Sequence, residues 1–275
     1  MYKRQIRTRG LRVEGASGDH TIQLNATMDA EKAGHCDLII LATKAMQVEA
    51  AARSAKPLIG KNTTVLTIQN GIGSSEKVAA LLGKERVTVG VAGGFGASIE
   101  APGHVHHNGM ELIRLGEIKG PVSQRLKDIT AVWTSAGFNA RAYDDIQQMI
   151  WEKLICNVCY SGVCTVSGSR IGQVLKDDGL WQIAKGCAGE AYQVAMAKGI
   201  KVDIDEPVSY VRAFGEKMPN AKPSMLLDHL AGRTSEIEAI NGAIVREGAN
   251  ADVSTTFNRI MTALIIAKER RHGLR

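Results

Sequence analysis

The first half of the chain alternates between short, continuous apolar runs and stretches in which apolar residues have helical spacing. Residues 37–43 and 64–69 are apolar runs flanked by polar residues, a pattern typical of strands covered on both faces of a parallel sheet. Further strands are expected at 87–91, 111–115 and 139–143, a hairpin at 11–15 and 21–24, and helices at 46–57, 75–83 and 121–136. This order predicts an open, mostly parallel α/β sheet.

From about residue 144 the pattern changes. Apolar residues recur every three or four positions, which indicates helices, and no convincing strand follows. The expected helices are 144–161, 179–198, 205–217, 224–247 and 254–270. The sequence therefore predicts a dinucleotide-type α/β domain over residues 1–143 and an all-α domain over residues 144–275. The cleft between two such domains is a common place for a ligand.

Three polar residues, Lys153, Asn157 and Ser161, lie four positions apart in the first of these helices. Residues at this spacing share one helix face, and the neighbouring Ile150 and Leu154 mark the helix as packed. Burying an ammonium group costs several kcal/mol unless a partner stabilises it. The stripe therefore indicates the wall of a cleft, although a lysine that extends along the helix edge into solvent would fit the same spacing.

The net charge of +6 is compatible with anionic ligands such as carboxylates and phosphates. Basic residues are spread along the chain, apart from a small cluster at 268–272 that suits the end of a helix. Nucleic acid is therefore not an expected partner. There is neither an apolar stretch of about 20 residues nor a signal-peptide pattern, so we expect no membrane partner and a cytoplasmic protein.

Five cysteines in a chain of 275 residues do not suggest a disulfide framework and favour a reducing compartment. Cys156 and Cys159 have neither a second Cys-x-x-Cys nor a His beside them, so buried apolar roles are favoured over metal or redox roles. His104, His106 and His107 resemble a metal cluster, but a strand would divide them between its two faces. With no carboxylate or cysteine nearby in sequence, no metal site is expected there.

Six short motifs occur in order along the chain. They are Lys44-Ala45, Gln69-Asn70-Gly71-Ile-Gly73, Pro102-Gly-His-Val-His-His-Asn-Gly109, Trp151-Glu-Lys153-Leu-x-x-Asn157, Pro223-Ser224-Met-Leu-x-Asp228 and Ser235-Glu236-Ile-Glu-Ala-Ile-Asn241-Gly242. Each motif is weak alone. Together, in this order, they resemble the ketopantoate reductases (2-dehydropantoate 2-reductases) from about Arg7 to about residue 270.

The resemblance implies a Rossmann-like N-terminal domain and the NADPH-dependent reduction of ketopantoate to (R)-pantoate, a step of pantothenate and coenzyme A synthesis. It assigns Lys153 as the general acid that protonates or polarises the ketone oxygen, and Glu236 as a catalytic acid close to that lysine. The resemblance further implies that the 2-keto acid is held by Asn157, Ser161, Ser224 and Asn241, and NADP(H) by Lys44, Asn70 and Gly71.

These residue types suit the chemistry. Hydride addition to a ketone builds negative charge on oxygen, so a cationic proton donor lowers the barrier. The pKa of a lysine shifts readily on burial, and a carboxylate partner would fix the position of the ammonium group. Simpler explanations stay open: Ser224 follows Pro223 and could be a helix N-cap, and Glu236 could be an exposed helix acid. Lys44 could be a solvated lysine, although strand ends in such sheets commonly bind ligands.

The family's first strand and its Gly-x-Gly-x-x-Gly turn, which holds the cofactor's pyrophosphate, have no counterpart in the sequence. The stretch Gly90-Val-Ala-Gly93-Gly94-Phe-Gly96 is rejected as that turn because no helical pattern follows it. We hypothesise a truncated reading frame that lacks about 30 residues, the first strand and helix included, with residues 1–5 not native. The chain is then expected to bind NADPH poorly, to expose strand edges and to aggregate, while its helical domain could still fold.

The substrate within the 2-keto acid class stays open, because Ser161 stands where many relatives carry an asparagine. One alternative is a reductase of another branched or larger 2-keto acid, and a second is a non-catalytic fragment without cofactor binding. NADP rather than NAD rests on the resemblance alone, and Arg7 and Arg9 could contact its 2′-phosphate or be surface charges. The oligomeric state is not readable, although helical second domains often pair, which makes a homodimer a candidate.

Overall fold

The computed structural model describes residues 2–94, 96–109 and 112–275. The chain divides into two compact units. The first unit comprises Met1–Thr43, Gln47–Gln69 and Ser74–Ile146, and the second comprises Lys44–Met46, Asn70–Gly73 and Gln147–Arg275. Two short loops from the first half of the chain therefore belong to the second unit. Among the described residues, no helix combines the length and the apolarity that crossing a bilayer would require.

The first unit contains a five-stranded sheet in the order β3-β4-β5-β8-β9. Its strands are β3 (Cys36–Leu41), β4 (Ile59–Thr67), β5 (Val87–Gly93), β8 (Leu112–Glu117) and β9 (Ala140–Ala142). All neighbours pair in parallel except β5 and β8, so the expectation of a mostly parallel sheet is confirmed. Among the described residues β3 pairs only with β4, and Ile40 on this edge strand is 43% exposed.

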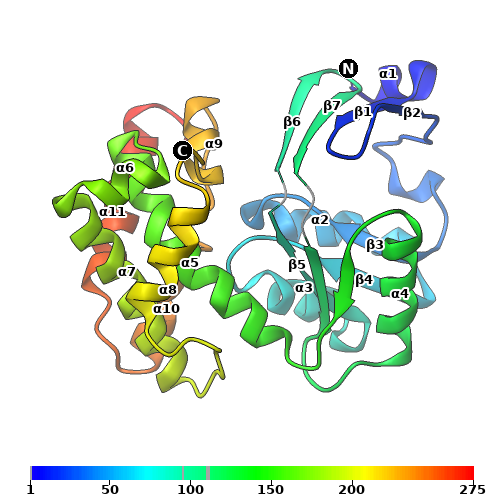
Figure 1. Ribbon diagram of the computed structural model, residues 1–275. Helices are drawn as coiled ribbons and strands as arrows, with labels where there is room; N and C mark the ends of the chain where they lie inside the picture. The colour runs from blue at the N-terminus through cyan, green and yellow to red at the C-terminus, as the bar shows by residue number, and fades with distance from the viewer. Residues whose placement is uncertain (1, 95, 110–111) are drawn as a thin grey trace. The chain divides into compact units, whose positions relative to one another are not determined.

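Helices cover both faces of this sheet (Figure 1). They are α2 (Val48–Ser54), α3 (Ser74–Leu82) and α4 (Gln124–Ser135), with short 3₁₀ turns at Ala30–Lys32, Ala45–Gln47, Lys56–Leu58 and Lys84–Arg86. Successive side chains of a strand point to opposite faces. Val65 accordingly packs with Val48 of α2 and Val78 of α3, whereas Leu66 packs with Leu126 of α4.

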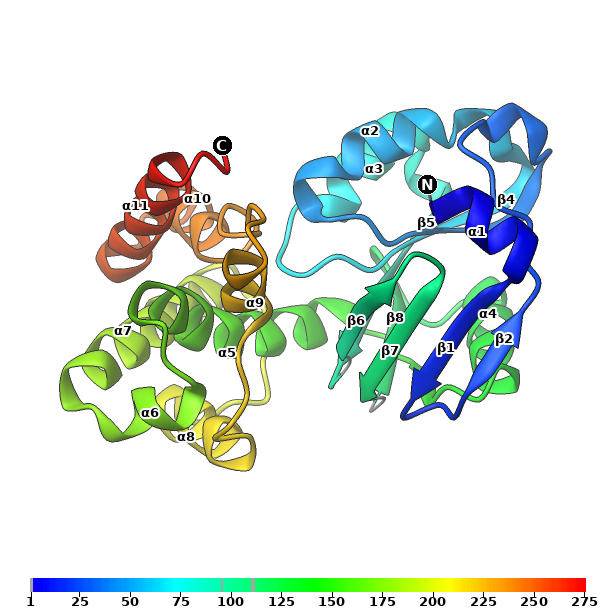
Figure 2. The ribbon, with the colours of Figure 1, turned by 90° about the horizontal axis from the view of Figure 1, so that it is seen from above.

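A second, four-stranded sheet has the order β2-β1-β7-β6, and its strands lie side by side in Figure 2. They are β1 (Leu11–Gly15), β2 (His20–Ile22), β6 (Gly96–Ala101) and β7 (His104–Gly109), preceded by an unexpected helix α1 (Tyr2–Arg9). The predicted hairpin is confirmed, since β1 and β2 are antiparallel. The sequence had predicted one sheet, and it did not reveal that this separate sheet forms by parallel pairing of β1 with the distant β7.

The three neighbouring histidines lie on β7, and their side chains alternate between its faces as expected. His104 Nε2 lies 3.1 Å and His106 Nδ1 3.8 Å from Glu14 Oε1. His107 Nδ1 instead lies 3.2 Å from Ser17 Oγ. The glycine-rich stretch from Gly90 to Gly96 leads into the strand β6 rather than into a helix, in agreement with its rejection as a phosphate-binding turn.

The second unit is helical, and residues 147–275 contain no strand. Its helices are α5 (Ile146–Ser167), α6 (Ile171–Lys176), α7 (Asp178–Ala197), α8 (Pro207–Lys217), α9 (Ser224–Leu230), α10 (Asn241–Asn250) and α11 (Thr256–Arg271). Consecutive positions of α5 are buried from Leu154 to Cys156 and from Val158 to Thr165. A helical segment buried on all sides belongs to a core, and this second half of α5 lies among the other helices of the second unit (Figure 1).

The prediction of one continuous helix over 224–247 is wrong. Helix α9 ends at Leu230, α10 begins at Asn241, and residues 231–240 are not helical. Gly232 has a φ of +65°, and the following Arg233 N–H donates to Asp228 O at 2.8 Å. A glycine in the left-handed region with such a backward hydrogen bond ends a helix. Glu236 therefore lies on an irregular segment and not on a helix.

Glu269 of α11 is a fully buried carboxylate. Burial opposes its charged form, but hydrogen bonds from Arg275 and Ser235 outweigh burial and hold the pKa of Glu269 below its ordinary value of 4.5. A carboxylate with a lowered folded-state pKa stabilises the protein above the unfolded-state pKa, and this stability is lost as pH falls through the folded-state pKa.

Glu269→Gln is therefore expected to lower the free energy of unfolding by about 1.5–3 kcal/mol at neutral pH, the value of a hydrogen bond to a charged group. The difference from the unchanged protein should shrink below pH 4.5. Denaturant titrations between pH 7 and pH 3 measure both quantities. Glu247→Gln, which removes a surface ion pair with Lys198, is the control and should change stability by less than about 1 kcal/mol. A pH-independent difference for Glu269→Gln would contradict this prediction.

Candidate active site

The candidate site begins in the two loops that follow β3 and β4. Lys44 lies three residues after β3 ends, and Asn70 lies three residues after β4 ends. The side chain of Gln69, which follows β4, connects this loop to the end of β3. Its Nε2 donates to Leu41 O at 2.6 Å and to Thr43 O at 3.1 Å. Lys44 and Asn70 themselves belong to the second unit.

Lys44 is paired with two buried carboxylates of the second unit. Its Nζ lies 2.6 Å from Asp228 Oδ2 and 3.7 Å from Glu236 Oε2. Asp228 is 3% exposed and Glu236 is 5% exposed. Buried carboxylates need such partners, because removing a charge from water is costly unless it is paired and hydrogen-bonded. Neither Lys44 nor Glu236 is thus a merely solvated surface residue in this structure.

Asn70 connects Glu236 to Lys153. Its Nδ2 donates to Glu236 Oε2 at 3.3 Å, and its Oδ1 accepts from Lys153 Nζ at 2.8 Å. The amide therefore presents its donor to the carboxylate and its acceptor to the ammonium group. Lys153 and Glu236 were expected to be close, and the structure brings them together with Asn70 between them.

The backbone also contributes to this site. Ala45 N–H donates to Glu236 Oε1 at 2.9 Å, so both carboxylate oxygens of Glu236 accept a hydrogen bond from a loop of the first half of the chain. Nearly every residue type has a backbone N–H group, so the sequence could not identify Ala45 as a donor, and this contact was not predicted.

Gly71 is a site where backbone segments approach closely. Its φ is +80°, and a Cβ atom at this position would lie 1.9 Å from Ala239 O. The next residue, Ile72, donates its N–H to the same oxygen at 3.1 Å. This close approach gives Gly71 a steric role, namely to let the Asn70 loop reach the segment that contains Glu236.

The four predicted substrate-binding residues differ in their accessibility. Asn157 is half-buried, Ser161 is buried and Ser224 is exposed. Ser224 is the first residue of α9 and makes no side-chain cap contact, since the N-cap position is occupied by Pro223. The N-cap explanation for Ser224 is therefore wrong.

Asn241 lies in the interior of the second unit and is 0% exposed. Its Nδ2 donates to Val158 O of α5 at 3.2 Å and to Asn258 Oδ1 of α11 at 3.0 Å. In this structure its amide therefore links three helices and offers a substrate no exposed surface.

Asp228 and Arg233 had no predicted role, although Asp228 closes one of the six motifs. Besides its contact with Lys44, Asp228 accepts at Oδ1 from Arg233 Nε at 3.2 Å. A carboxylate at a fixed place in a motif was a usable signal. Its partner could not be inferred, because Lys44 lies 184 positions away in the sequence.

The cysteines of α5 are packed among apolar side chains. Burial raises the pKa of the Cys156 thiol to about 12 and that of Cys159 well above its ordinary value. All five cysteines are free thiols. Because the thiolate is the reactive form, these environments support the expected role as small apolar residues.

The described residues do not account for the diphosphate of a dinucleotide. The loop before α3 contains two glycines with positive φ, Gly71 and Gly73, and leads into a helix. The space beside Gly71, however, is occupied by Ala239. The first turn of α3 also carries Glu76, whose negative charge opposes the binding of an anion.

Comparisons with known proteins identify the family of this chain. The family model described as "Ketopantoate reductase PanE/ApbA" matches residues 2–120, and the model for the family's C-terminal part matches residues 145–269. A 2-dehydropantoate 2-reductase of Archaeoglobus fulgidus is 30% identical over 257 residues, which span 94% of this chain and 83% of that protein. The chain belongs to the ketopantoate reductase family.

Solved structures give the same result for the fold. The 2-dehydropantoate 2-reductase of Geobacter metallireducens GS-15 is 30% identical, with a TM-score of 0.89 over 96% of this chain and 88% of that one. A D-mandelate dehydrogenase in complex with NADH and anilino(oxo)acetate is 27% identical, with a TM-score of 0.89 over 100% of this chain and 89% of that one. The family match begins at residue 2, which corrects the expected start near Arg7.

Proposed function

We propose that this member of the ketopantoate reductase family reduces the ketone of 2-dehydropantoate to give (R)-pantoate. The observation that best supports this is the continuous contact from Lys153 through Asn70 to Glu236. The ammonium group of Lys153 is held by the amide oxygen of Asn70, which accepts a hydrogen bond but does not take the proton. Such a group is suited to donate a proton to an oxygen on which negative charge develops.

In the proposed reaction the reduced nicotinamide supplies the hydride, and the chain's own residues supply the proton and the substrate contacts. Lys153 donates its proton to the carbonyl oxygen, which becomes the hydroxyl of the product, and Lys153 is then reprotonated from water. Asn157 lies one helical turn from Lys153 on the same face of α5 and is the proposed contact for the substrate's polar groups. Ser224, which is exposed, is a second candidate contact.

Glu236 and Asp228 act differently in this proposal. Glu236 fixes the Asn70 amide and the Ala45 backbone, and so fixes the acceptor that holds Lys153. Asp228 pairs with Lys44 at 2.6 Å and limits how far that lysine can move. Lys44 and Asn70 are the proposed residues near the ribose and nicotinamide, and Gly71 allows their approach.

A second candidate is the reduction of a larger 2-keto acid. It is favoured by the similarity to a D-mandelate dehydrogenase whose structure contains NADH and anilino(oxo)acetate. Ser161, buried at 3% exposure, is shorter than the asparagine expected from the family and is compatible with a different substrate shape.

A substrate panel distinguishes the two candidates. 2-Dehydropantoate, phenylglyoxylate and an unbranched 2-keto acid are each supplied with NADPH or NADH, and the loss of reduced-nicotinamide absorbance is followed. The highest kcat/KM with 2-dehydropantoate and NADPH is the expected result. A clear preference for phenylglyoxylate would favour the second candidate, and turnover of none of the acids at a cofactor concentration high enough to offset weak binding would contradict both. In the proposed role the protein acts in the cytoplasm, in pantothenate synthesis.

We expect the 275-residue protein to bind NADPH weakly, because its sequence contains no Gly-x-Gly-x-x-Gly turn. That turn brings backbone N–H groups and a helix N-terminus to the pyrophosphate. Calorimetric titration should show no saturation below about 1 mM, a binding free energy weaker than about −4 kcal/mol. Micromolar affinity would contradict this expectation.

A further inference from the structure

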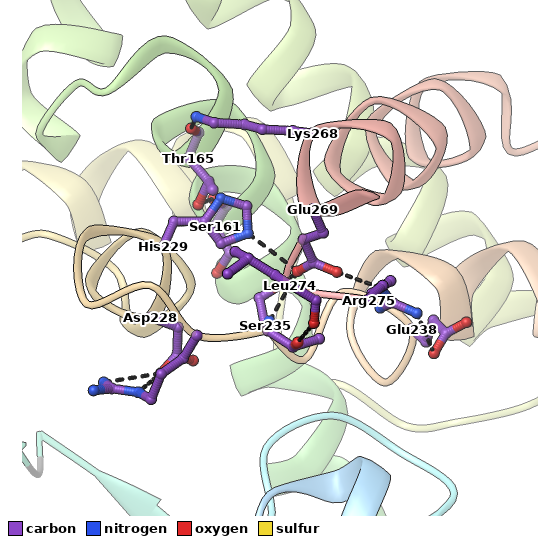
Figure 3. A network of polar contacts seen from close by, with 12 residues as sticks. Ser161, Thr165, Asp228, His229, Ser235, Glu238, Lys268, Glu269, Leu274 and Arg275 are labelled. Carbon is purple, nitrogen blue, oxygen red and sulfur yellow. Dashed lines mark hydrogen bonds and ion pairs between the residues drawn. The ribbon is translucent and has the colours of Figure 1, made fainter. Parts of the chain in front are cut away.

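The buried carboxylate of Glu269 is the centre of a polar network in the second unit (Figure 3). Its Oε1 accepts from Ser235 N–H at 2.8 Å and from Ser235 Oγ at 2.6 Å, and it lies 3.1 Å from His229 Nε2. Its Oε2 accepts from Arg275 Nε. One side chain of α11 therefore contacts α9, through His229, and the segment between α9 and α10, through Ser235.

Both of those parts are direct neighbours of residues in the candidate active site. His229 follows Asp228, and Ser235 precedes Glu236. Asp228 and Glu236 are the two carboxylates that pair with Lys44. Glu269 therefore contacts the residue next in sequence to each of these two carboxylates.

The segment between α9 and α10 depends on such outside contacts. Residues 231–240 are not helical, so the regular hydrogen bonds of a helix do not fix the direction of their side chains. Besides the contacts of Glu269, Thr234 Oγ1 donates to Leu274 O, and Arg275 lies 3.2 Å from Glu238 Oε2. The residues on both sides of Glu236 are thus held by α11 and the residues after it.

We propose that Glu269 is a positioning residue that acts through Ser235 to fix the carboxylate of Glu236. The catalytic part of this inference rests on the proposed reductase function, in which Glu236 orients Asn70 and thereby Lys153. Glu269 does not touch the reacting groups. Its effect reaches Glu236 through the backbone of Ser235, and from there Ala45 N–H at 2.9 Å and Asn70 Nδ2 at 3.3 Å.

The exchange rate of the Ala45 amide hydrogen tests this inference without any enzyme assay, because that N–H donates to Glu236 Oε1. Glu269→Gln removes the charge, and Ser235→Ala removes one hydrogen bond and is the milder variant. In both we expect the Ala45 amide to exchange about tenfold faster, the weakening of roughly one hydrogen bond. Amides in the middle of α10 are the internal reference for global stability.

Lys268→Met is the matched control. Lys268 precedes Glu269 on the same helix, and its Nζ donates to Thr165 O of α5 at 2.7 Å, so the variant loses a contact between helices that does not involve residues 228–236. Its Ala45 amide should exchange at the rate of the unchanged protein. If Glu269→Gln does not fold, Ser235→Ala decides the question alone.

Steady-state kinetics supply the second measurement. Misplacement of a catalytic group by about 1 Å can cost about 10²-fold in rate, so kcat of Glu269→Gln should fall about 10–100-fold while KM changes less than threefold. Unchanged Ala45 exchange in folded Glu269→Gln and Ser235→Ala would overturn the positioning role whatever the activity. Absence of turnover in the unchanged protein would instead contradict the proposed function, and the exchange measurement would still decide the role of Glu269.

Discussion

Lys153→Ala is expected to lower kcat for 2-dehydropantoate by about 10²–10⁴-fold, the usual contribution of a general acid. The ammonium group of Lys153 donates to Asn70 Oδ1 at 2.8 Å, and alanine removes both the charge and the proton. KM should change much less, because in the proposed reaction the interaction strengthens as charge develops on the ketone oxygen. All variants are compared at one NADPH concentration, so that weak cofactor binding lowers their rates alike.

Two variants separate the possible causes of such a loss. Lys153→Arg keeps a positive charge but holds its proton too tightly to donate it near neutral pH, so it should recover only part of the rate. Lys176→Ala removes an exposed lysine at the end of α6 and should leave kcat unchanged. Near-normal turnover by Lys153→Ala would show that another group supplies the proton.

Gly71→Ala is expected to destabilise the second unit by about 2–6 kcal/mol, the sum of a strained backbone conformation and an overpacked contact. Gly71 has a φ of +80°, and the added Cβ would lie 1.9 Å from Ala239 O. Because the obstacle is a backbone oxygen and not a flexible side chain, the Asn70 loop or residue 239 must move. Denaturant unfolding measures the stability, and the displaced Asn70 should also lower kcat.

Gly73→Ala is the matched control for this variant. Gly73 has a φ of +99°, but among the described residues no heavy atom beyond its two chain neighbours lies within 4 Å of a Cβ built there. Its substitution should therefore cost only the conformational strain, about 1–3 kcal/mol. Equal destabilisation by the two alanines would mean that the contact with Ala239 has no energetic importance.

The sequence was sufficient to predict the strands and covering helices of the five-stranded sheet, because strand and helix periodicities are local, but it did not reveal the second sheet of the first unit. Residues 64–69, for example, read as a buried strand, and β4 ends at Thr67 with Thr64 to Thr67 all buried. The placement of Lys44 and Asn70 just beyond strand ends could be inferred in the same way, since the carboxyl ends of parallel strands share an edge.

The rest depends on contacts between distant parts of the chain. Apolar spacing over 224–247 could not reveal the break at Gly232, which allows Glu236 to reach the Ala45 backbone. Asn241 belongs to the same motif as Glu236, five positions earlier, yet its amide faces the interior, toward Val158 O and Asn258. No local pattern distinguishes an amide that links helices from one that binds a substrate.

The second unit is assembled from three stretches of chain, which bears on how the protein can be divided. Expressing residues 147–275 alone would omit Lys44–Met46 and Asn70–Gly73. Asp228 and Glu236 would then lose the Lys44 ammonium group, and Glu236 would also lose the Ala45 and Asn70 donors. In a helical fragment cut at the apparent boundary, Glu236 is thus left without these three partners, and Asp228 keeps its contact with Arg233 but loses Lys44. Domain exchange with a relative should therefore transfer both loops together with the helices.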